Sequence, residues 1–108
     1  MINGYDDLAF IFSLDLKKKY CLEIAFHLQS SEKFSHCWMG KMRKEATASQ
    51  DLYWFGLEAA GLETDDYDSF EDMANAPVFD GACLKDICHM LDIDEINDIP
   101  PEEYLHSL

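Results

Sequence analysis

The segment YCLEIAFHL, residues 20–28, alternates apolar side chains with residues that are mostly polar or small. One half of the alternation consists of Tyr20, Leu22, Ile24, Phe26 and Leu28, and the other of Cys21, Glu23, Ala25 and His27. A period of two residues is typical of a strand that buries one face. The segment therefore predicts a β-strand within a sheet that has one buried side.

The preceding segment, LAFIFSLDL at residues 8–16, has a similar alternation that runs through Leu8, Phe10, Phe12, Leu14 and Leu16. The polar KKK at residues 17–19 suits a turn, so the pattern predicts an antiparallel hairpin. The apolar run LAFIFSL is equally compatible with a buried helix.

Two further segments favour strands. SHCWMGKMRKE, residues 35–45, is expected to return as a strand through Cys37, Trp38 and Met39. DLYWFG, residues 51–56, has three adjacent aromatic residues, which suits a central strand covered on both faces. These aromatic side chains, together with Trp38, could form a protein-binding hot spot. In a domain this small we expect them instead to be part of the hydrophobic core.

The pattern changes to helices in the second half of the chain. Ser69, with Asp72 three residues later, approximates a capping box, and FEDMANA at residues 70–76 continues as a short helix up to Pro77. ACLKDICHML, residues 82–91, carries one apolar stripe at helical spacing, made of Leu84, Ile87, Cys88 and Leu91.

The last two segments predict a strand and a helix. DIDEINDI, residues 92–99, is expected to be a short strand or an extended arm, and PPEEYLHSL, residues 100–108, a short helix opened by Pro101. Strands come first and helices later. The fold class expected is therefore α+β, a single small domain over residues 1–108 with a mainly antiparallel sheet and two or three short helices from the C-terminal half.

Composition supports a folded protein inside the cell. The chain has 108 residues, 48% of them hydrophobic and 13% aromatic, which is enough for one core. Its beginning, MINGYDD, is acidic where a secretory signal needs basic residues. We therefore expect a cytoplasmic protein whose four cysteines are reduced thiols, and the oligomeric state stays open.

The formal net charge of −14 is distributed unevenly along the chain. Residues 1–50 contain seven Lys and Arg against six Asp and Glu, whereas from Asp51 onward Lys85 is the only cation among sixteen acids. Self-repulsion of this size destabilises a compact state, and solubility requires only a modest net charge. A generally acidic proteome would have made the first half acidic as well, so the asymmetry favours a surface with a binding function.

The acidic half predicts the residues that would bind a partner. If the carboxylates converge on one field, they would be spaced comparably to successive phosphates and would attract a basic cleft. The residues that we expect to bind the partner are Glu63, Asp65, Asp66, Asp68, Glu71, Asp72, Asp92, Asp94, Glu95 and Asp98. A direct nucleic-acid binder is disfavoured, because the phosphate backbone would repel this chain.

No catalytic residue, cofactor or metal is predicted. The four histidines are scattered, and neither a G-x-S-x-G motif nor a phosphate-binding G-x4-G-K-[ST] motif occurs. An alternative from another class is a metal-binding domain or small enzyme that uses Cys37, Cys83, Cys88 and His89. Cys83 and Cys88 are five residues apart on an expected helix, which differs from the tight knuckles of structural zinc sites, so core packing is favoured.

The chain resembles two groups of known proteins. YWFG, FEDMANAPVFDGACLKDI and PPEEYL, within residues 53–105, resemble a pattern in small uncharacterised bacterial and phage proteins, which implies no functional residues. In size and charge the chain also resembles anti-restriction and anti-CRISPR inhibitors of phages, several of which mimic DNA, and immunity proteins that neutralise nuclease toxins. This second likeness lies in composition.

The leading hypothesis is an acidic inhibitor, without enzyme activity, that binds the basic nucleic-acid-binding surface of a nuclease or other defence effector. A phage anti-defence protein of the anti-CRISPR kind is the form favoured. The alternative is an immunity protein against a nuclease toxin, which would also bind through attraction between its acidic side chains and a basic surface of the target.

Overall fold

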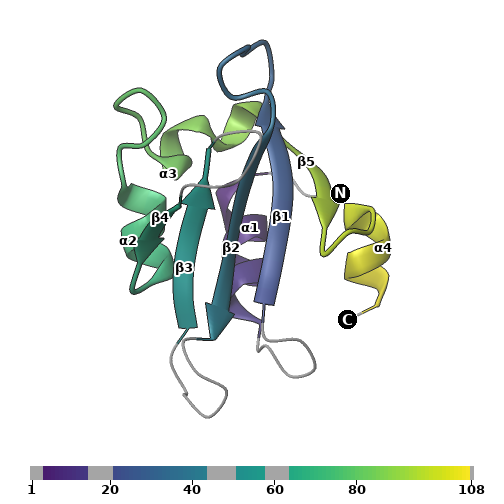
Figure 1. Cartoon of the computed structure of the whole chain (residues 1–108). Helices are drawn as coiled ribbons and strands as arrows, with labels where there is room; N and C mark the ends of the chain where they lie inside the picture. Colours follow the sequence, from purple (N-terminus) through teal and green to yellow (C-terminus); the bar gives the residue numbers. More distant parts are fainter. Residues whose placement is uncertain (1–3, 15–20, 44–50, 58–63, 108) are drawn as a thin grey trace.

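The computed structural model describes residues 4–14, 21–43, 51–57 and 64–107 of the chain. These residues form a five-stranded antiparallel sheet and four α-helices (Figure 1). The strands are β1 (Cys21–Leu28), β2 (Cys37–Arg43), β3 (Asp51–Gly56), β4 (Asp65–Tyr67) and β5 (Leu91–Ile96). Their order across the sheet is β4-β3-β2-β1-β5, so β4 and β5 are the two edge strands. The predicted α+β class is confirmed.

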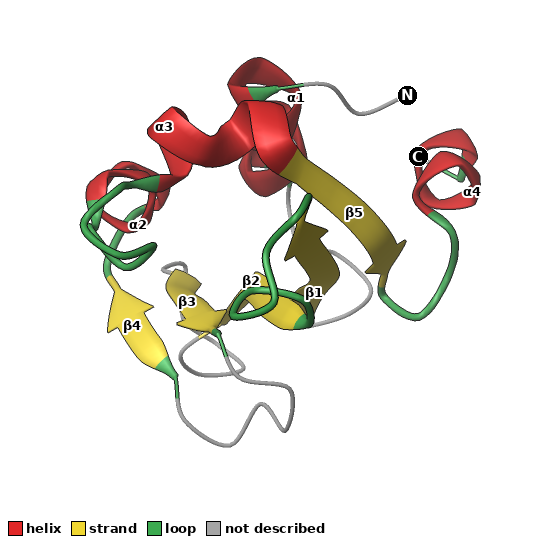
Figure 2. Cartoon of the chain, turned by 90° about the horizontal axis from the view of Figure 1, so that it is seen from above, coloured by secondary structure: helices red, strands yellow, loops and turns green. Residues whose placement is uncertain are grey.

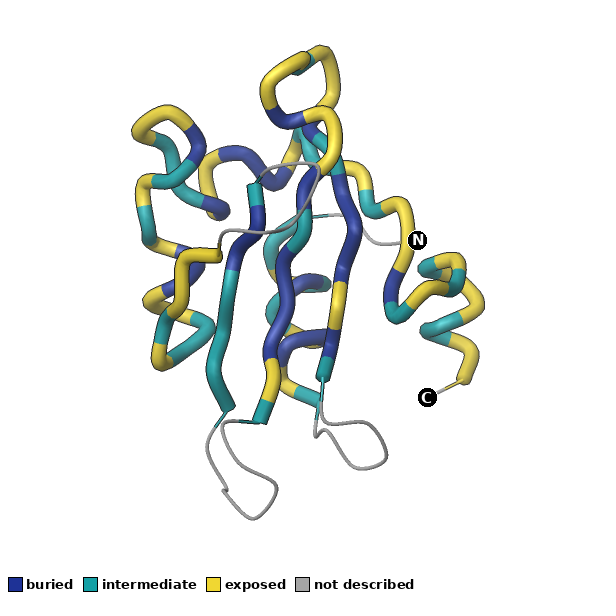
Figure 3. Tube along the Cα trace, viewed as in Figure 1, coloured by how far each residue is buried: buried dark blue, intermediate teal, exposed yellow. Residues whose placement is uncertain are grey.

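The three central strands bury one set of alternating side chains. Ile24 pairs with Met39 across β1 and β2, and Met39 pairs with Phe55 across β2 and β3. All three side chains are fully buried. Every second residue of β1 from Leu22 to Leu28 is also buried, so the strand predicted from the alternation is confirmed (Figure 3).

The first element is a helix, α1 (Tyr5–Ser13), and the strand predicted at residues 8–16 is wrong. Leu8, Ile11 and Phe12 are buried at helical spacing, whereas Phe10 is 56% exposed. The apolar residues of this segment are compatible both with the two-residue period of a strand and with the 3.6-residue period of a helix. Packing against the sheet therefore decides that the segment is a helix. The turn expected at residues 17–19 lies outside the described residues, and β1 pairs instead with β2 and β5.

A buried lysine attaches the end of α1 to the sheet. Lys41 of β2 is 3% exposed, and its Nζ donates to the carbonyl oxygens of Phe12 at 2.7 Å and Leu14 at 2.6 Å. The last carbonyls of a helix have no partner within the helix, and a cation suits the negative end of the helix dipole. Lys41 therefore stabilises the C-terminal end of α1.

The second helix, α2 (Phe70–Asn75), begins as the sequence predicts. The Ser69 hydroxyl oxygen accepts a hydrogen bond from the backbone N–H of Asp72 at 3.0 Å, which caps the helix. The helix ends two residues before Pro77.

The third and fourth helices are also short. The predicted amphipathic stripe forms α3 (Leu84–Ile87) and a single 3-10 turn, η1 (Cys88–Met90), after which Leu91 already belongs to β5. The last helix, α4 (Pro101–His106), begins at Pro101 as predicted. These are the three helices of the C-terminal half, and α1 is additional to them.

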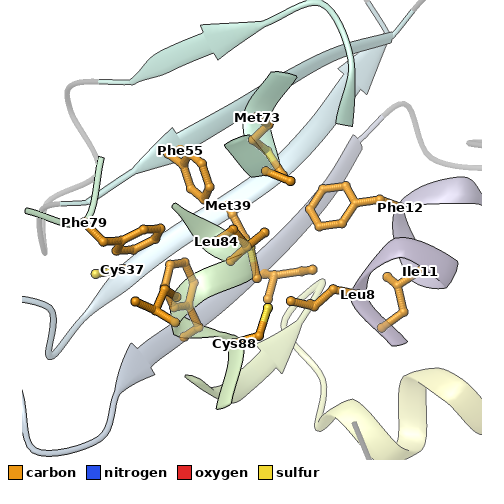
Figure 4. Packing of buried hydrophobic residues seen from close by; sticks show 14 of the residues in the cluster. Leu8, Ile11, Phe12, Cys37, Met39, Phe55, Met73, Phe79, Leu84 and Cys88 are labelled. Atoms are coloured by element: carbon orange, nitrogen blue, oxygen red, sulfur yellow. The ribbon is translucent and has the colours of Figure 1, made fainter. Parts of the chain in front are cut away.

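The core lies between the sheet and the helices α1, α2 and α3, which all cover the same face of the sheet (Figure 2). Phe12 of α1 stacks on Phe70 of α2 with ring centroids 4.9 Å apart, and Phe79 meets Phe55 edge to face at 5.4 Å (Figure 4). No helix within the described residues covers the opposite face, and α4 packs beside the edge strand β5.

Candidate interaction surfaces

The acidic residues predicted to bind a partner fall into two groups. Nine of the ten lie within the described part of the chain and are exposed, and Glu63 lies outside it. The group that we call the β4 edge comprises Asp65, Asp66, Asp68, Glu71 and Asp72. The group that we call the β5 edge comprises Asp92, Asp94, Glu95 and Asp98.

The two groups lie at opposite sides of the sheet, because β4 and β5 are its two outer strands. Four strand spacings separate β4 from β5, which corresponds to about 19 Å along a flat sheet. The sequence gives no indication of this division. These nine carboxylates thus form two acidic borders with the sheet between them.

The β4 edge combines carboxylates next to or in β4 with two in the first turn of α2. Within the described residues, Asp65 and Asp66 have no cation within salt-bridge distance. Desolvation, together with the fields of these two carboxylates, raises the pKa of Tyr67. Glu71 and Asp72 occupy the first turn of α2, where negative charge suits the helix dipole, so they also have a structural reason for their position.

The β5 edge contains a histidine held between two carboxylates. The pairing of β1 with β5 shifts register next to Asp94, which places this residue in a bulge. His27 Nδ1 lies 3.0 Å from both carboxylate oxygens of Asp94, and its Nε2 lies 3.4 Å from Asp92 Oδ2. The hydrogen bond with Asp94 raises the pKa of His27 against the opposing effect of desolvation, and both negative charges add to the increase.

Asp92 and Asp98 have further neighbours at this edge. Gln29 Nε2 donates to Asp92 Oδ2 at 3.1 Å. Asp98 follows Asn97 in a turn in which both residues have positive φ, and the Asn97 side chain accepts from the backbone N–H of Glu23 at 2.8 Å. The carboxylate at position 98 is therefore presented by a turn that is fixed to β1.

The sheet face opposite the helices, called the open face below, carries both tryptophans of the chain. The cross-strand pairs on this face include Glu23, Ala25, Trp38, Gly40, Trp54, Gly56, Asp66 and Glu95, and also Cys21, His27, Met42, Leu52 and Asp92. Trp38 and Trp54 are partly exposed and lie outside the core cluster, so placing them in the core was wrong. Phe55 and Tyr53, at the alternate positions of β3, do face the core as expected.

The cysteines are free thiols, and two of them are buried in the core. Burial raises the pKa of Cys37 and of Cys88 to about 11, so both are protonated at neutral pH. A metal ligand or a nucleophile requires the thiolate, and this environment opposes it. Within the described residues, no three His, Cys, Asp or Glu side chains are grouped so that they could hold a metal ion.

Comparisons with known proteins give no relative: no protein-family model, curated protein or solved structure matches the chain. Among the helices that the structure describes, none has the length and apolar character needed to cross a bilayer. The function proposed next therefore rests on the charge and geometry of the described surfaces.

Proposed function

We propose that this chain is a cytoplasmic protein inhibitor, without catalytic activity, that binds the basic nucleic-acid-binding surface of a nuclease or another defence effector. The observation that supports it best is the pair of acidic borders, in which nine exposed carboxylates line the two sides of one sheet. The favoured form is a phage anti-defence protein of the anti-CRISPR kind that mimics the charge of DNA.

The mechanism is competition for the target's cationic side chains. Carboxylates form short charge-assisted hydrogen bonds with Arg and Lys, and these are the groups with which the target binds phosphates or reads bases. Residues two apart on a strand have side chains on one face about 7 Å from each other, a spacing comparable to that of successive phosphates. A net charge of −14 also speeds the encounter with a basic cleft.

Acidic edge strands have a second possible role, because charged side chains on an edge prevent sheets from pairing with one another. That role needs a charge or two on each edge. It does not explain sixteen acids against one cation from Asp51 onward. The excess charge therefore favours a partner.

An immunity protein that neutralises a nuclease toxin is the second candidate. It shares the acidic borders, and it is favoured by the two tryptophans on the open face, because tryptophan is enriched among the residues that dominate binding energy at protein interfaces. The two candidates differ in the target, so an assay with defined targets separates them.

The test measures DNA binding by purified enzymes of three classes: an RNA-guided nuclease, a restriction endonuclease and a nuclease toxin. Each is assayed by mobility shift with and without an excess of this protein, over a series of salt concentrations. We expect inhibition of one class that weakens steeply with salt. Reversing the charge of Asp65, Asp66, Asp92 and Glu95 to Lys should slow association with that target.

A single-site control reverses Glu32, an exposed loop residue that belongs to neither border, and should leave association with the target nearly unchanged. If no enzyme of the three classes loses DNA binding, or if inhibition persists after reversal of both borders, the proposed function is wrong.

A further inference from the structure

Each tryptophan of the open face lies opposite a glycine. Trp38 of β2 pairs with Gly56 of β3, and Gly40 of β2 pairs with Trp54 of β3. A Cβ at Gly40 would overlap the Leu22 carbonyl oxygen and lie 2.8 Å from the Trp54 ring. The Trp54 indole therefore lies over the backbone of Gly40, where any side chain would displace it.

Cross-strand pairing extends these two pairs into rows that contain carboxylates. Glu95, Ala25, Trp38 and Gly56 face one another in one row, from β5 to β3. Glu23, Gly40, Trp54 and Asp66 do so in the next, from β1 to β4. Each row thus has an indole separated from a glutamate by one small residue, and the second row also has Asp66 next to its indole on the same face of the sheet. The two indoles are diagonal neighbours, about 7–8 Å apart at Cα.

The carboxylates of these rows are unpaired in the part of the chain that the structure describes. No cation there lies within salt-bridge distance of Glu23, Asp66 or Glu95. Met42, next on the same face of β2, is 45% exposed. Among the described residues, the open face therefore presents indole and thioether surface beside carboxylates that have no cation within salt-bridge distance.

We infer that the open face binds an arginine-bearing segment of the protein partner, with Trp38 and Trp54 as stacking platforms and Glu23, Asp66 and Glu95 as the paired carboxylates. Guanidinium is planar and weakly hydrated, so it stacks on an indole and donates to a carboxylate in the same plane, which ammonium does less well. Ala25 places only a methyl group between Trp38 and Glu95 in its row, whereas in the other row the Trp54 indole itself lies over Gly40. This inference rests on the proposed function and adds the place and the chemistry of contact.

The first experiment uses the wild-type protein and two synthetic peptides, one of alternating arginine and serine and one in which lysine replaces arginine. Because the chain has only two tryptophans, its tryptophan fluorescence, excited selectively over tyrosine, and its two indole N–H signals in NMR report on the open face alone. We expect the arginine peptide to shift both indole signals, and to bind several-fold more tightly than the lysine peptide. Binding of the two peptides with equal affinity, or without a change at either indole, overturns the inference.

The second experiment compares two variants that lose the same three charges. In the open-face variant Glu23→Gln, Asp66→Asn and Glu95→Gln are combined; in the control, Glu32→Gln, Glu102→Gln and Glu103→Gln are combined, all at exposed positions outside the open-face rows. In about 150 mM salt the Debye length is about 8 Å, so distant charges contribute little. We expect the open-face variant to bind the arginine peptide roughly tenfold more weakly, and the control to change by less than about threefold.

A further variant, Trp38→Leu, keeps an apolar side chain and removes one of the two π surfaces, and is expected to reduce the preference for arginine over lysine. Equal weakening by the two charge variants overturns the inference but leaves the proposed function intact, because the borders would then act only as a diffuse field. Absence of nuclease inhibition by the wild type, together with arginine-peptide binding that the open-face variant loses and the control keeps, has the reverse meaning. Absence of peptide binding overturns the inference, and the DNA-binding assay alone then decides the function.

Discussion

The two faces of this sheet are built from alternating residues of the same strands, yet they differ in almost every physical respect. The covered face carries Ile24, Met39 and Phe55, all fully buried beneath the helices. The open face carries Trp38 and Trp54 among glycines, alanine and carboxylates. One set of side chains supplies the hydrophobic stabilisation, which leaves the other set free to be charged and aromatic at little cost in stability.

The largest effect should come from the covered face. Phe55→Ala removes a side chain that is fully buried and packs edge to face on Phe79. We expect a loss of about 3–5 kcal/mol in the free energy of unfolding, measured by urea denaturation. Trp38→Ala, on the open face of the neighbouring strand, should cost only about 1 kcal/mol. Equal losses would show that the two faces contribute equally to the free energy of unfolding, contrary to this account.

A smaller loss is expected for Lys41→Met, although this residue also lies on the covered face. Methionine keeps the aliphatic stem but leaves the carbonyl oxygens of Phe12 and Leu14 without their donor. It also removes the cation 3.5 Å from Asp51, which keeps Arg43 at 3.7 Å. The expected loss is roughly 2–3 kcal/mol, read from thermal unfolding.

Lys33→Met is the matched control for this change. Lys33 also pairs with an aspartate, Asp80, but its side chain is 66% exposed. Removing it should change stability by no more than about 0.5 kcal/mol. If the two lysine variants lose the same stability, the attachment of α1 through Lys41 has no energetic importance.

Gly40→Ala tests whether the open face also constrains stability. The new methyl group would meet the Leu22 carbonyl oxygen and the Trp54 ring, so strands β1 and β2 would have to separate locally. We expect a loss of about 2 kcal/mol in the free energy of unfolding. Adding Trp54→Leu should recover only part of it, because the backbone oxygen remains. Complete recovery would mean that the indole is the sole obstacle.

The sequence predicts elements where one periodicity dominates. The alternation over residues 20–28 identifies β1 because burial on one side enforces it. At residues 8–16 two periods coexist, and only the packing of Leu8, Ile11 and Phe12 against the sheet selects the helix. The short strand β4 (Asp65–Tyr67) was not predicted, because aspartate disfavours strands and pairing with β3 is what holds it extended.

For the candidate surfaces too, some features could be predicted from the local sequence, and others depend on how distant segments pair. Exposure of the acidic residues could be predicted from their charge alone. Their division into two borders depends on strand order, which no local pattern contains. In YWF all three residues are apolar, so only the register with β2 shows that Phe55 faces the core while Trp54 faces outward. The Trp–Gly pairs could have been suspected from the glycines at positions 40 and 56, had the register been known.

His27 gives the smallest of these effects, at the boundary between the open face and the β5 edge. Its pKa is raised above the ordinary value of 6.5, mainly by the hydrogen bond with Asp94 and also by the charges of Asp94 and Asp92. A raised pKa in the folded state means that protonation favours folding. This stabilisation is fully present below about pH 6.5, and it is lost as the pH rises through the pKa of the folded protein.

His27→Gln should therefore reduce stability more at about pH 5.5 than at about pH 8. The side chains of His27, Asp92 and Asp94 are one third to one half exposed, so water screens the pair and the difference should be only about 0.5 kcal/mol. Urea denaturation of both proteins at the two pH values measures it, and a larger deficit at the higher pH would contradict the assignment. Protonation also removes negative charge from the β5 edge, so a basic partner should bind the wild type, but not the variant, more weakly at the lower pH. The β5 edge beside the open face would then respond to pH near neutrality, whereas the buried Cys37 thiol of the covered face, whose pKa is about 11, would not.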